Sequence, residues 1–491
     1  MAISRLNKQN MRNFSIILLS TLLFACGESL SYKMPDKGTI ETAIEKGEFT
    51  EASKMVRLYL ACDTLTPRER YEMSFLLEWM DRVKDDFDQT DSSVIAYIKK
   101  HYPQATTEQI SEWEKSNALE NKVIDGQKRY FSLAGRNLFR IDSLAEKHFQ
   151  YKEGEKPDSL TRLLSKLIPQ LVNEAKTKKG VYVNPVKMKI RYTLSVKPNE
   201  VPDGESVRVW MPYPRTDTKS HTDIQLLSTT QPLYIISPDS YAHKSIYMEG
   251  VAVKDEPLKF GFELIYTSFA QVHLFGAEDI KDYDTTGEIY KEYTGESGQH
   301  IRFSDNIRSA VKEAIGEESN PYLKARKIYE WIDSNFPWAS AREYSTIENI
   351  PEYVLKNRHG DCGQVSLLFI TMARCAGVPA KWQSGWMMHP GNINLHDWAE
   401  VWFEGVGWVP VDQSFGRVKS SKGDDSAFYF FTKGLDPYRL IVNDNISGEF
   451  FPAKIYPRSE TVDFQRGEVE WRGENLYFGR WRYKMEVEYI K

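Results

Sequence analysis

Residues 361–412 combine a helix pattern with two strand patterns, and this combination requires a mixed α+β fold. Apolar residues recur at helical spacing in the first part, and Gly377 followed by Val378-Pro379 ends that helix. The stretches 395–403 and 408–412 then alternate apolar and polar residues, which is typical of strands with one buried face. This part of the chain therefore predicts a helix packed against a strand hairpin.

The whole chain is too long for one hydrophobic core. At 491 residues it exceeds the size at which a single core stops growing, so several domains are expected. Helical spacing dominates up to about residue 180, and a period of two dominates from there to about residue 280. The predicted fold class is multidomain α+β. We expect a signal peptide at 1–25, a mainly helical region with a small hairpin at 26–180, an antiparallel β-sandwich at 181–280, the mixed α+β core at 295–418, and C-terminal strands packed on that core at 419–491.

The N-terminus has the features of a targeting segment. Three basic residues precede the apolar run 14–25, which is too short for a spanning helix and ends at Cys26. The run resembles a bacterial lipoprotein signal, which implies that Cys26 carries the lipid. An ordinary secretory signal cut near Ala25 is the alternative. We expect lipid anchoring in the cell envelope, and Gly27 after the cysteine favours the outer membrane.

The other cysteines and the net charge exclude several classes of protein. Cys62, Cys362 and Cys375 form an odd set, so at least one thiol stays free, and no CxxC pair exists. A disulfide scaffold and a Cys-rich zinc site are therefore excluded, and we expect neither a metal nor another cofactor. The net charge of −5 gives no electrostatic argument for a nucleic-acid partner. No oligomeric state follows from the sequence.

Cys362 occupies a position that favours thiol chemistry. Asp361 suits the N-cap of the helix, which places Cys362 in the first turn. The free N–H groups and the helix dipole favour negative charge there, so we expect a stabilised thiolate. The same N–H groups can donate to an oxyanion formed from an attacked carbonyl. A buried cysteine that only begins a core helix is the alternative interpretation.

His396 and Asp412 lie on the two predicted strands. A three-residue loop at 405–407 puts both side chains on one face of the hairpin, whereas a two-residue loop opposes them. Even with the right parity, simple pairing leaves His396 several residues beyond Asp412, so we expect either a bulge, for example at Pro410, or a slant of the strands. Without the other two residues, His396 is interpreted equally well as a structural surface residue or as a base.

Four sequence blocks together resemble the core of the transglutaminase-like superfamily. They are Gly360-Asp361-Cys362, 374–380, 396–402 and 407–412. The resemblance implies a papain-like core in which Cys362 is the nucleophile, His396 the general base and acid, and Asp412 the carboxylate that orients the imidazole. It further implies cysteine-dependent acyl transfer at an amide bond of a peptide or protein substrate, by hydrolysis or transamidation through a thioester. The alternative is a non-catalytic envelope binding protein or glycan-utilisation accessory lipoprotein that keeps the fold.

Several aromatic side chains are further candidates for the site. Trp338 is a candidate second oxyanion donor, with a core-capping tryptophan as the alternative. Trp386, Trp398 and Trp402 are candidates to line a substrate groove, and core packing is the alternative for each. His389 lies in a Gly-Asn-Pro loop, where we expect a solvated side chain or a contact at the rim of the site.

Overall fold

The computed structural model describes residues 35–149 and 159–490, so the predicted signal peptide and Cys26 lie outside the described residues. Within those two ranges, no helix is both long enough and apolar enough to cross a membrane. The chain divides into two compact units, one up to Ser74 and one from Phe75 onward.

The first unit is a helical hairpin followed by the start of a longer helix. Helix α2 (Lys37–Glu45) begins at Asp36, whose carboxylate accepts a hydrogen bond from the Thr39 amide at 3.3 Å. Gly47 has a φ of 77° and separates α2 from α3 (Phe49–Leu60), as the sequence predicts. Helix α4 (Pro67–Asp86) starts in this unit and ends in the second.

The second unit begins with five helices and a small hairpin among its described residues. In chain order these elements are α5 (Asp91–His101), α6 (Thr107–Lys115), β1 (Asn121–Ile124), β2 (Gln127–Tyr130), α7 (Ala134–Ile141), α8 (Ser143–His148) and α9 (Ser159–Lys178). Asp125 and Gly126 connect β1 and β2 with φ angles of 48° and 76°. Two positive φ angles define the tight turn that an Asp-Gly pair favours, so the predicted hairpin is confirmed.

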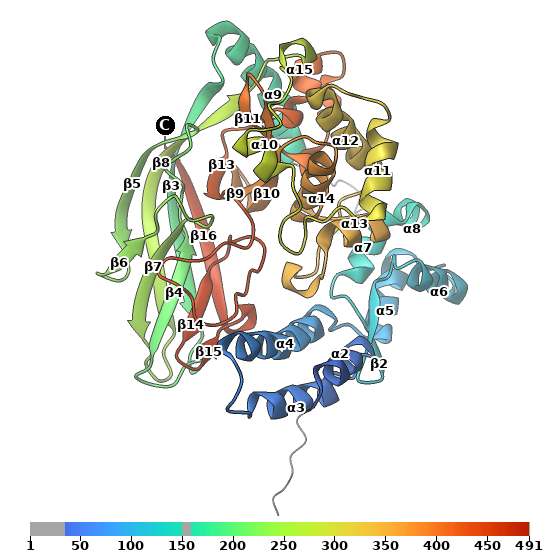
Figure 1. Ribbon diagram of the computed structural model, residues 1–491, viewed down its shortest axis with the longest axis vertical. Helices are drawn as coiled ribbons and strands as arrows, with labels where there is room; N and C mark the ends of the chain where they lie inside the picture. Colours follow the sequence, from blue (N-terminus) through green and yellow to red (C-terminus); the bar gives the residue numbers. More distant parts are fainter. Residues whose placement is uncertain (1–34, 150–158, 491) are drawn as a thin grey trace, which may run out of the picture. The chain divides into compact units, whose positions relative to one another are not determined.

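Two antiparallel sheets form the β-sandwich (Figure 1). One sheet contains β3 (Tyr182–Val196), β5 (His221–Thr229), β8 (Leu258–Val272), β12 (Gly434–Leu435) and β16 (Trp481–Ile490). The other contains β4 (Ser206–Pro212), β6 (Tyr234–Ile236), β7 (Ser245–Val251), β14 (Glu468–Trp471) and β15 (Glu474–Asn475). Alternate residues of these strands, such as Tyr192, Trp210 and Phe260, are fully buried in one apolar cluster.

The C-terminal strands differ in part from the prediction, which packed residues 419–491 on the α+β core: Arg439–Asn443 joins the sheet of that core, whereas the later strands do not. Strand β16 pairs with β3 from Trp481 opposite Val196 to Ile490 opposite Lys187, and β14 pairs with β4. These strands therefore complete the sandwich, because the edges of β3 and β4 need backbone partners that local sequence cannot identify. Within the same tail, α15 (Asp425–Phe428) begins after Asp424, whose carboxylate accepts hydrogen bonds from the amides of Ser426 and Ala427.

The mixed α+β core consists of five helices and one antiparallel sheet of four strands. The helices are α10 (Glu288–Tyr293), α11 (Asp305–Ile315), α12 (Pro321–Asn335), α13 (Ile350–Asn357) and α14 (Cys362–Cys375). The sheet contains β9 (Ala380–His389), β10 (Asn392–Phe403), β11 (Gly407–Val411) and β13 (Arg439–Asn443), in the order β11-β10-β9-β13. Short 3-10 turns occur at Ala277–Asp279, Tyr344–Thr346, Gln413–Phe415, Lys419–Ser421, Phe430–Thr432 and Phe478–Arg480.

Helix α14 lies at the centre of this core (Figure 1). All its residues from Gly363 to Arg374 are buried, and its apolar side chains share a cluster with Ala399, Val401 and Phe403 of β10. One face of β10 therefore packs on α14, and residues of opposite parity point to the other side of the sheet. The odd-numbered residues of β10 around Ala399 are therefore the ones that face α14 and can contact its N-terminus.

Candidate active site

Cys362 is the first residue of α14, where the sequence places it. The Asp361 carboxylate accepts a hydrogen bond from the Gln364 amide at 3.1 Å, and the Gln364 side chain accepts one from the Asp361 amide at 3.2 Å. This reciprocal capping box fixes the start of the helix. The Tyr344 hydroxyl donates a further hydrogen bond to Asp361 at 2.7 Å.

The Cys362 thiol contacts a carboxylate that the sequence did not identify. Its Sγ lies 3.4 Å from Oδ2 of Asp397, whose Oδ1 accepts a hydrogen bond from Gln465 at 2.6 Å. A side chain on Gly363 would come within 2.7 Å of Asp397 Oδ2, so glycine is required for this close approach. The structure therefore brings Cys362 and Asp397 together.

The electrostatic environment of the thiol is opposite to the predicted one. Burial, followed by the charges of Asp397 and Asp361, raises the pKa of Cys362 well above its usual value. Burial and the neighbouring carboxylates Asp463 and Asp361 also raise the pKa of Asp397. Burial and two carboxylates therefore oppose the favourable effect of the helix N-terminus. The direction of this shift is opposite to the stabilisation of the thiolate that the sequence predicts.

His396 and Asp412 form a buried pair. The His396 Nε2 lies 2.8 Å from Asp412 Oδ2. Burial lowers the pKa of His396, and Asp412 opposes that shift. Burial acts to raise the pKa of Asp412, but the charges of His396 and Arg439 together lower it. Among the described residues the imidazole has Asp412 as its hydrogen-bond partner, and no hydrogen bond joins it to Cys362.

The strand register explains how this pair forms. Phe403 pairs with Gly407 and Ala399 with Val411, so a three-residue loop joins β10 and β11 and the predicted parity is confirmed. The loop starts one residue earlier than predicted, which brings Asp412 within two positions of His396 on the same face. Pairing continues through Pro410 without a shift, so the bulge, one of the two predicted alternatives, is wrong. The diagonal separation of neighbouring strands is already short enough for this hydrogen bond.

A cavity of about 220 Å³ opens beside the thiol. Its lining includes Trp338, which is 47% exposed and whose backbone forms a parallel bridge with Gly360. The Arg140 guanidinium lies 4.6 Å from the centre of the Trp338 ring. Trp338 therefore lies in the same cavity as Cys362, which is the placement that its predicted role requires.

Comparison with known proteins identifies this part of the chain. Residues 308–413 match the family model of the transglutaminase-like superfamily. The chain carries a transglutaminase-like core. The match contains Cys362, His396 and Asp412.

Individual relatives cover only parts of the chain. An uncharacterized protein, YebA, of Bacillus subtilis (strain 168) is 23% identical over 148 residues, which are 26% of this chain and 20% of that protein. An uncharacterized protein of Haemophilus influenzae is 27% identical over 142 residues, which are 23% of this chain and 37% of the relative. The chain thus spans well under half the length of both. A solved structure from Cytophaga hutchinsonii, described as a "putative cysteine protease", is 14% identical with a TM-score of 0.43, over 63% of this chain and 92% of that one.

Behind the His396–Asp412 pair, the transglutaminase-like core holds a buried cation that the sequence analysis missed. Arg439 of β13 lies 2.9 Å from Asp412 and 2.7 Å from Asp436. Asp436 in turn lies 2.9 Å from Nε2 of His389, which is fully buried and not a solvated loop residue as predicted. Strand β13 reaches this position by pairing with β9, a contact that no local pattern reveals. The local sequence feature that could have indicated this ion pair is an aspartate three residues before an arginine, at the start of an apolar strand.

Two of the three tryptophans predicted to line a groove are packed in the interior, and the third is half-buried. Trp386 is buried in the sandwich cluster and donates to the Gln465 carbonyl at 2.9 Å, and Trp398 is buried beside Arg439. Trp402 is half-buried and packs edge-on against Trp408. Their large apolar surface makes burial the favoured outcome. None of the three lines the Cys362 cavity.

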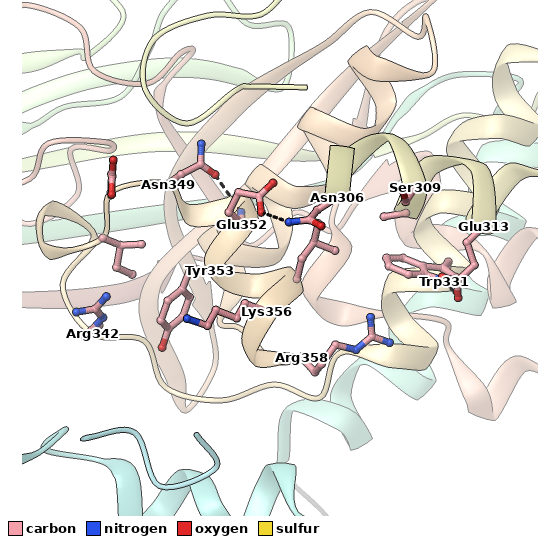
Figure 2. A pocket seen from close by; sticks show the side chains of 14 residues that line it. Asn306, Ser309, Glu313, Trp331, Arg342, Asn349, Glu352, Tyr353, Lys356 and Arg358 are labelled. Atoms are coloured by element: carbon pink, nitrogen blue, oxygen red, sulfur yellow. Dashed lines mark hydrogen bonds between the residues drawn. The ribbon is translucent and has the colours of Figure 1, made fainter. Parts of the chain in front are cut away.

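A second cavity, of about 780 Å³, lies between α11 and α13 (Figure 2). Glu352 organises one wall, because it accepts a hydrogen bond from Asn306 at 2.9 Å and donates its amide to Asn349 at 3.0 Å. Neither cysteine nor histidine is among the residues that line this cavity. The larger cavity therefore contributes no member of the predicted triad.

Proposed function

We propose that this protein is a cysteine-dependent enzyme of acyl transfer at an amide bond in peptides or proteins, with hydrolysis as its first reaction. The observation that carries the proposal is the placement of Cys362 in a cavity at the start of α14, inside the segment that matches the transglutaminase-like superfamily. Water is the most abundant acceptor in an aqueous envelope, and this favours hydrolysis over transamidation.

In the proposed reaction, Cys362 is the nucleophile and His396 the base. No hydrogen bond joins Cys362 to His396 among the described residues, so the imidazole has to come within reach of Sγ before it takes the thiol proton. Sulfur then bonds to the amide carbon, and the C–N bond breaks as the amine takes the proton. Water then attacks the thioester, releasing a carboxylic acid and restoring the thiol. Asp412 holds the imidazole through the 2.8 Å hydrogen bond and stabilises its cation. Trp338 is proposed as a donor to the oxyanion.

Asp397 is a competing acceptor for the thiol proton, since it contacts Sγ directly. Before attack, the proton has to leave this carboxylate contact, and either His396 or Asp397 can receive it. Asp397→Asn keeps the shape and removes the charge that raises the pKa of Cys362. If His396 is the base, this variant keeps turnover and reacts faster with iodoacetamide near neutral pH.

The test compares wild type with Cys362→Ala, His396→Ala and Asp397→Asn on cell-wall peptides and protein mixtures, with products identified by mass. Gain of water indicates hydrolysis, whereas loss of ammonia or ligation indicates transamidation. We expect turnover to vanish in Cys362→Ala and to fall by at least about 10²-fold in His396→Ala. Turnover that survives in Cys362→Ala rejects the proposal, and loss in Asp397→Asn together with retention in His396→Ala assigns the base to Asp397.

The second candidate function is an envelope binding protein or glycan-utilisation accessory lipoprotein without catalysis. The lack of a hydrogen bond between Cys362 and His396 among the described residues favours it, because the imidazole is then not placed to take the thiol proton. A glycan-array signal that Cys362→Ala leaves unchanged, without turnover of any peptide, is the outcome expected for this function.

The proposed cellular location is the envelope, with a lipid on Cys26 that anchors the chain to the outer membrane. The basic and apolar residues before Cys26 support this proposal. Metabolic labelling with a radioactive fatty acid in the producing bacterium tests it. We expect label on wild type and none on Cys26→Ser, and label retained on that variant contradicts the assignment.

A further inference from the structure

The cavity beside Cys362 is lined by an excess of carboxylates. Asp361 comes from the cap of α14, Asp397 from β10, Glu343 from the turn before α13, and Glu460 and Asp463 from the segment before β14. Acidic side chains from four separate parts of the chain thus converge on a space of about 220 Å³. This volume is smaller than a typical drug-sized site and suits a single side chain.

The two arginines in the lining are already engaged with glutamates. Arg466 forms a two-pronged contact with Glu343, at 2.8 and 2.7 Å, and a further one with Glu460 at 2.9 Å. Arg342 lies 3.3 Å from Glu120, outside the cavity. Both cations of the lining therefore neutralise glutamates.

The carboxylates of the three aspartates in the lining form no ion pair in the part of the chain that the structure describes, and Arg458 donates to the backbone carbonyl of Asp463 at 2.7 Å. Asp361 accepts its hydrogen bonds from Tyr344 and Gln364, and Asp397 from Gln465 and the Cys362 thiol. These donors are neutral. Buried carboxylates are normally paired with a cation. The three aspartates of the lining have no such partner, so a cation in the cavity would interact favourably with them.

Two polar side chains in the lining are poorly satisfied by the described residues. Ser345 is 9% exposed, and its hydroxyl oxygen has no hydrogen-bond partner among them. Asp463 is 7% exposed, and its carboxylate is hydrogen-bonded by its own backbone amide. Poorly satisfied buried polar groups are costly, so both indicate a ligand that completes their contacts.

An organic cation fits this cavity better than a metal ion. Among residues 35–149 and 159–490, no three side chains of His, Cys, Asp or Glu are arranged to hold a metal. A flexible side chain that ends in an ammonium or guanidinium group can instead reach Asp463 and fill the rest of the cavity. Burial, followed by the charge of Glu460, raises the pKa of Asp463, and the charge of Arg466 acts against this shift.

We infer that the cavity binds a positively charged side chain of the substrate, an ammonium or a guanidinium, next to the amide bond that Cys362 attacks. This inference rests on the proposed function, because it takes the bound molecule to be the substrate of Cys362. It assigns Asp463 as the main specificity residue. The cation is recognised and does not react. Peptides with lysine, arginine or a related basic residue beside the cleaved bond are the expected substrate class.

Three thiol reagents that differ in charge test the inference without requiring turnover. They are the methanethiosulfonates with a 2-aminoethyl (cationic), a methyl (neutral) and a 2-sulfonatoethyl (anionic) group. The cysteine sulfur forms a disulfide with the sulfenyl sulfur, and methanesulfinate leaves with the electron pair. Rates at Cys362 and Cys375 of the purified full-length protein are read by peptide mass mapping, with Cys375 correcting for the intrinsic reactivity of each reagent.

At Cys362 we expect a ratio of cationic to anionic rates about tenfold above that at Cys375, and a smaller ratio at high salt. In Asp463→Asn the ratio should fall toward that of Cys375. Glu348→Gln is the matched control, since it removes an exposed carboxylate outside this cavity and should leave the ratio unchanged. A wild-type ratio no higher than at Cys375, or a Cys362 that no reagent modifies, overturns the inference whether or not the variants fold.

A second measurement separates this inference from the proposed function. Peptides that carry lysine, arginine or norleucine beside the cleaved amide are compared for turnover. Preference for both basic residues over norleucine supports recognition, because a guanidinium cannot act as an acyl acceptor. Preference for lysine alone with a ligated product overturns recognition. Charge preference without turnover removes only the proposed function, whereas turnover without charge preference removes only this inference.

Discussion

At the scale of single residues, Asp86 holds the loop that runs past the Cys362 cavity. Its carboxylate accepts hydrogen bonds from the Thr346 hydroxyl at 2.7 Å and from the Glu343 amide at 3.3 Å. Burial raises the pKa of Asp86 from 3.8 to about 7. The folded protein therefore binds this proton more tightly than the unfolded chain, and the resulting stability is present below about pH 4 and lost as the pH rises through 7.

Asp86→Asn should remove this pH dependence while keeping the side-chain shape. Near pH 4 we expect variant and wild type to have similar stability, and above pH 7 the variant should be more stable by up to about 4 kcal/mol. Thermal unfolding between pH 4 and pH 8 measures the difference. Asp81→Asn, which removes an exposed carboxylate from the same helix, should follow the wild-type profile. A difference between Asp86→Asn and wild type that stays constant with pH contradicts the assignment.

Sequence reasoning succeeded where the determinants of a residue's position are local. The position of Cys362 depends on Asp361 and Gln364 within one helical turn, so capping rules predict it. The pairing of His396 with Asp412 depends on one short loop, so parity predicts it although the register is off by one residue. Both predictions use residues that are close in the chain.

The contacts of Asp397 and Arg439 could not be predicted in the same way. Alternation along β10 separates Asp397 from His396, but it does not say which face of the strand packs on α14. Arg439 reaches Asp412 only because β13 pairs with β9, more than fifty positions earlier in the chain. Such non-local pairing has no signature in a single sequence.

At the scale of secondary-structure elements, the close approach of β9 and β13 fixes Arg439 beside Asp412. Gly385 of β9 pairs with Ile441 of β13, and a Cβ on Gly385 would overlap the Leu440 carbonyl. The same Cβ would lie 3.0 Å from the amide nitrogen of Val442, so the clash is with backbone that cannot rotate away. Only glycine lets the two strands approach this closely.

Gly385→Ala should therefore push β13 outward and weaken the contact between Arg439 and Asp412. We expect a loss of about 1–3 kcal/mol in the free energy of unfolding, measured by urea denaturation. Gly479→Ala is the matched control, because a Cβ there meets no atom within 4 Å, and its effect should stay within about 0.5 kcal/mol. Equal stability of the two variants would show that β13 adjusts without cost.

At the scale of the unit from Phe75 onward, the sandwich and the transglutaminase-like core share one apolar cluster. Trp386 and Leu440 of the core sheet are buried in the same cluster as Trp210 and Tyr192 of the sandwich. The rings of Tyr192 and Trp386 stack with centroids 5.0 Å apart. Side chains that fill one interior lose their contacts together, so the two parts should unfold as one cooperative structure.

Trp210→Ala tests this cooperativity, because Trp210 lies in the sandwich and its indole donates to the Pro452 carbonyl at 2.8 Å. The substitution should lower the free energy of unfolding by about 3–5 kcal/mol. Hydrogen exchange read by mass should show the same loss of protection in β3 and in the distant helix α14, whereas Leu233→Ala, at an 83% exposed position, changes neither. If α14 keeps its protection from hydrogen exchange while β3 loses its own, the core is stable without the sandwich. The shared cluster then contributes packing, but it does not make the two parts unfold together.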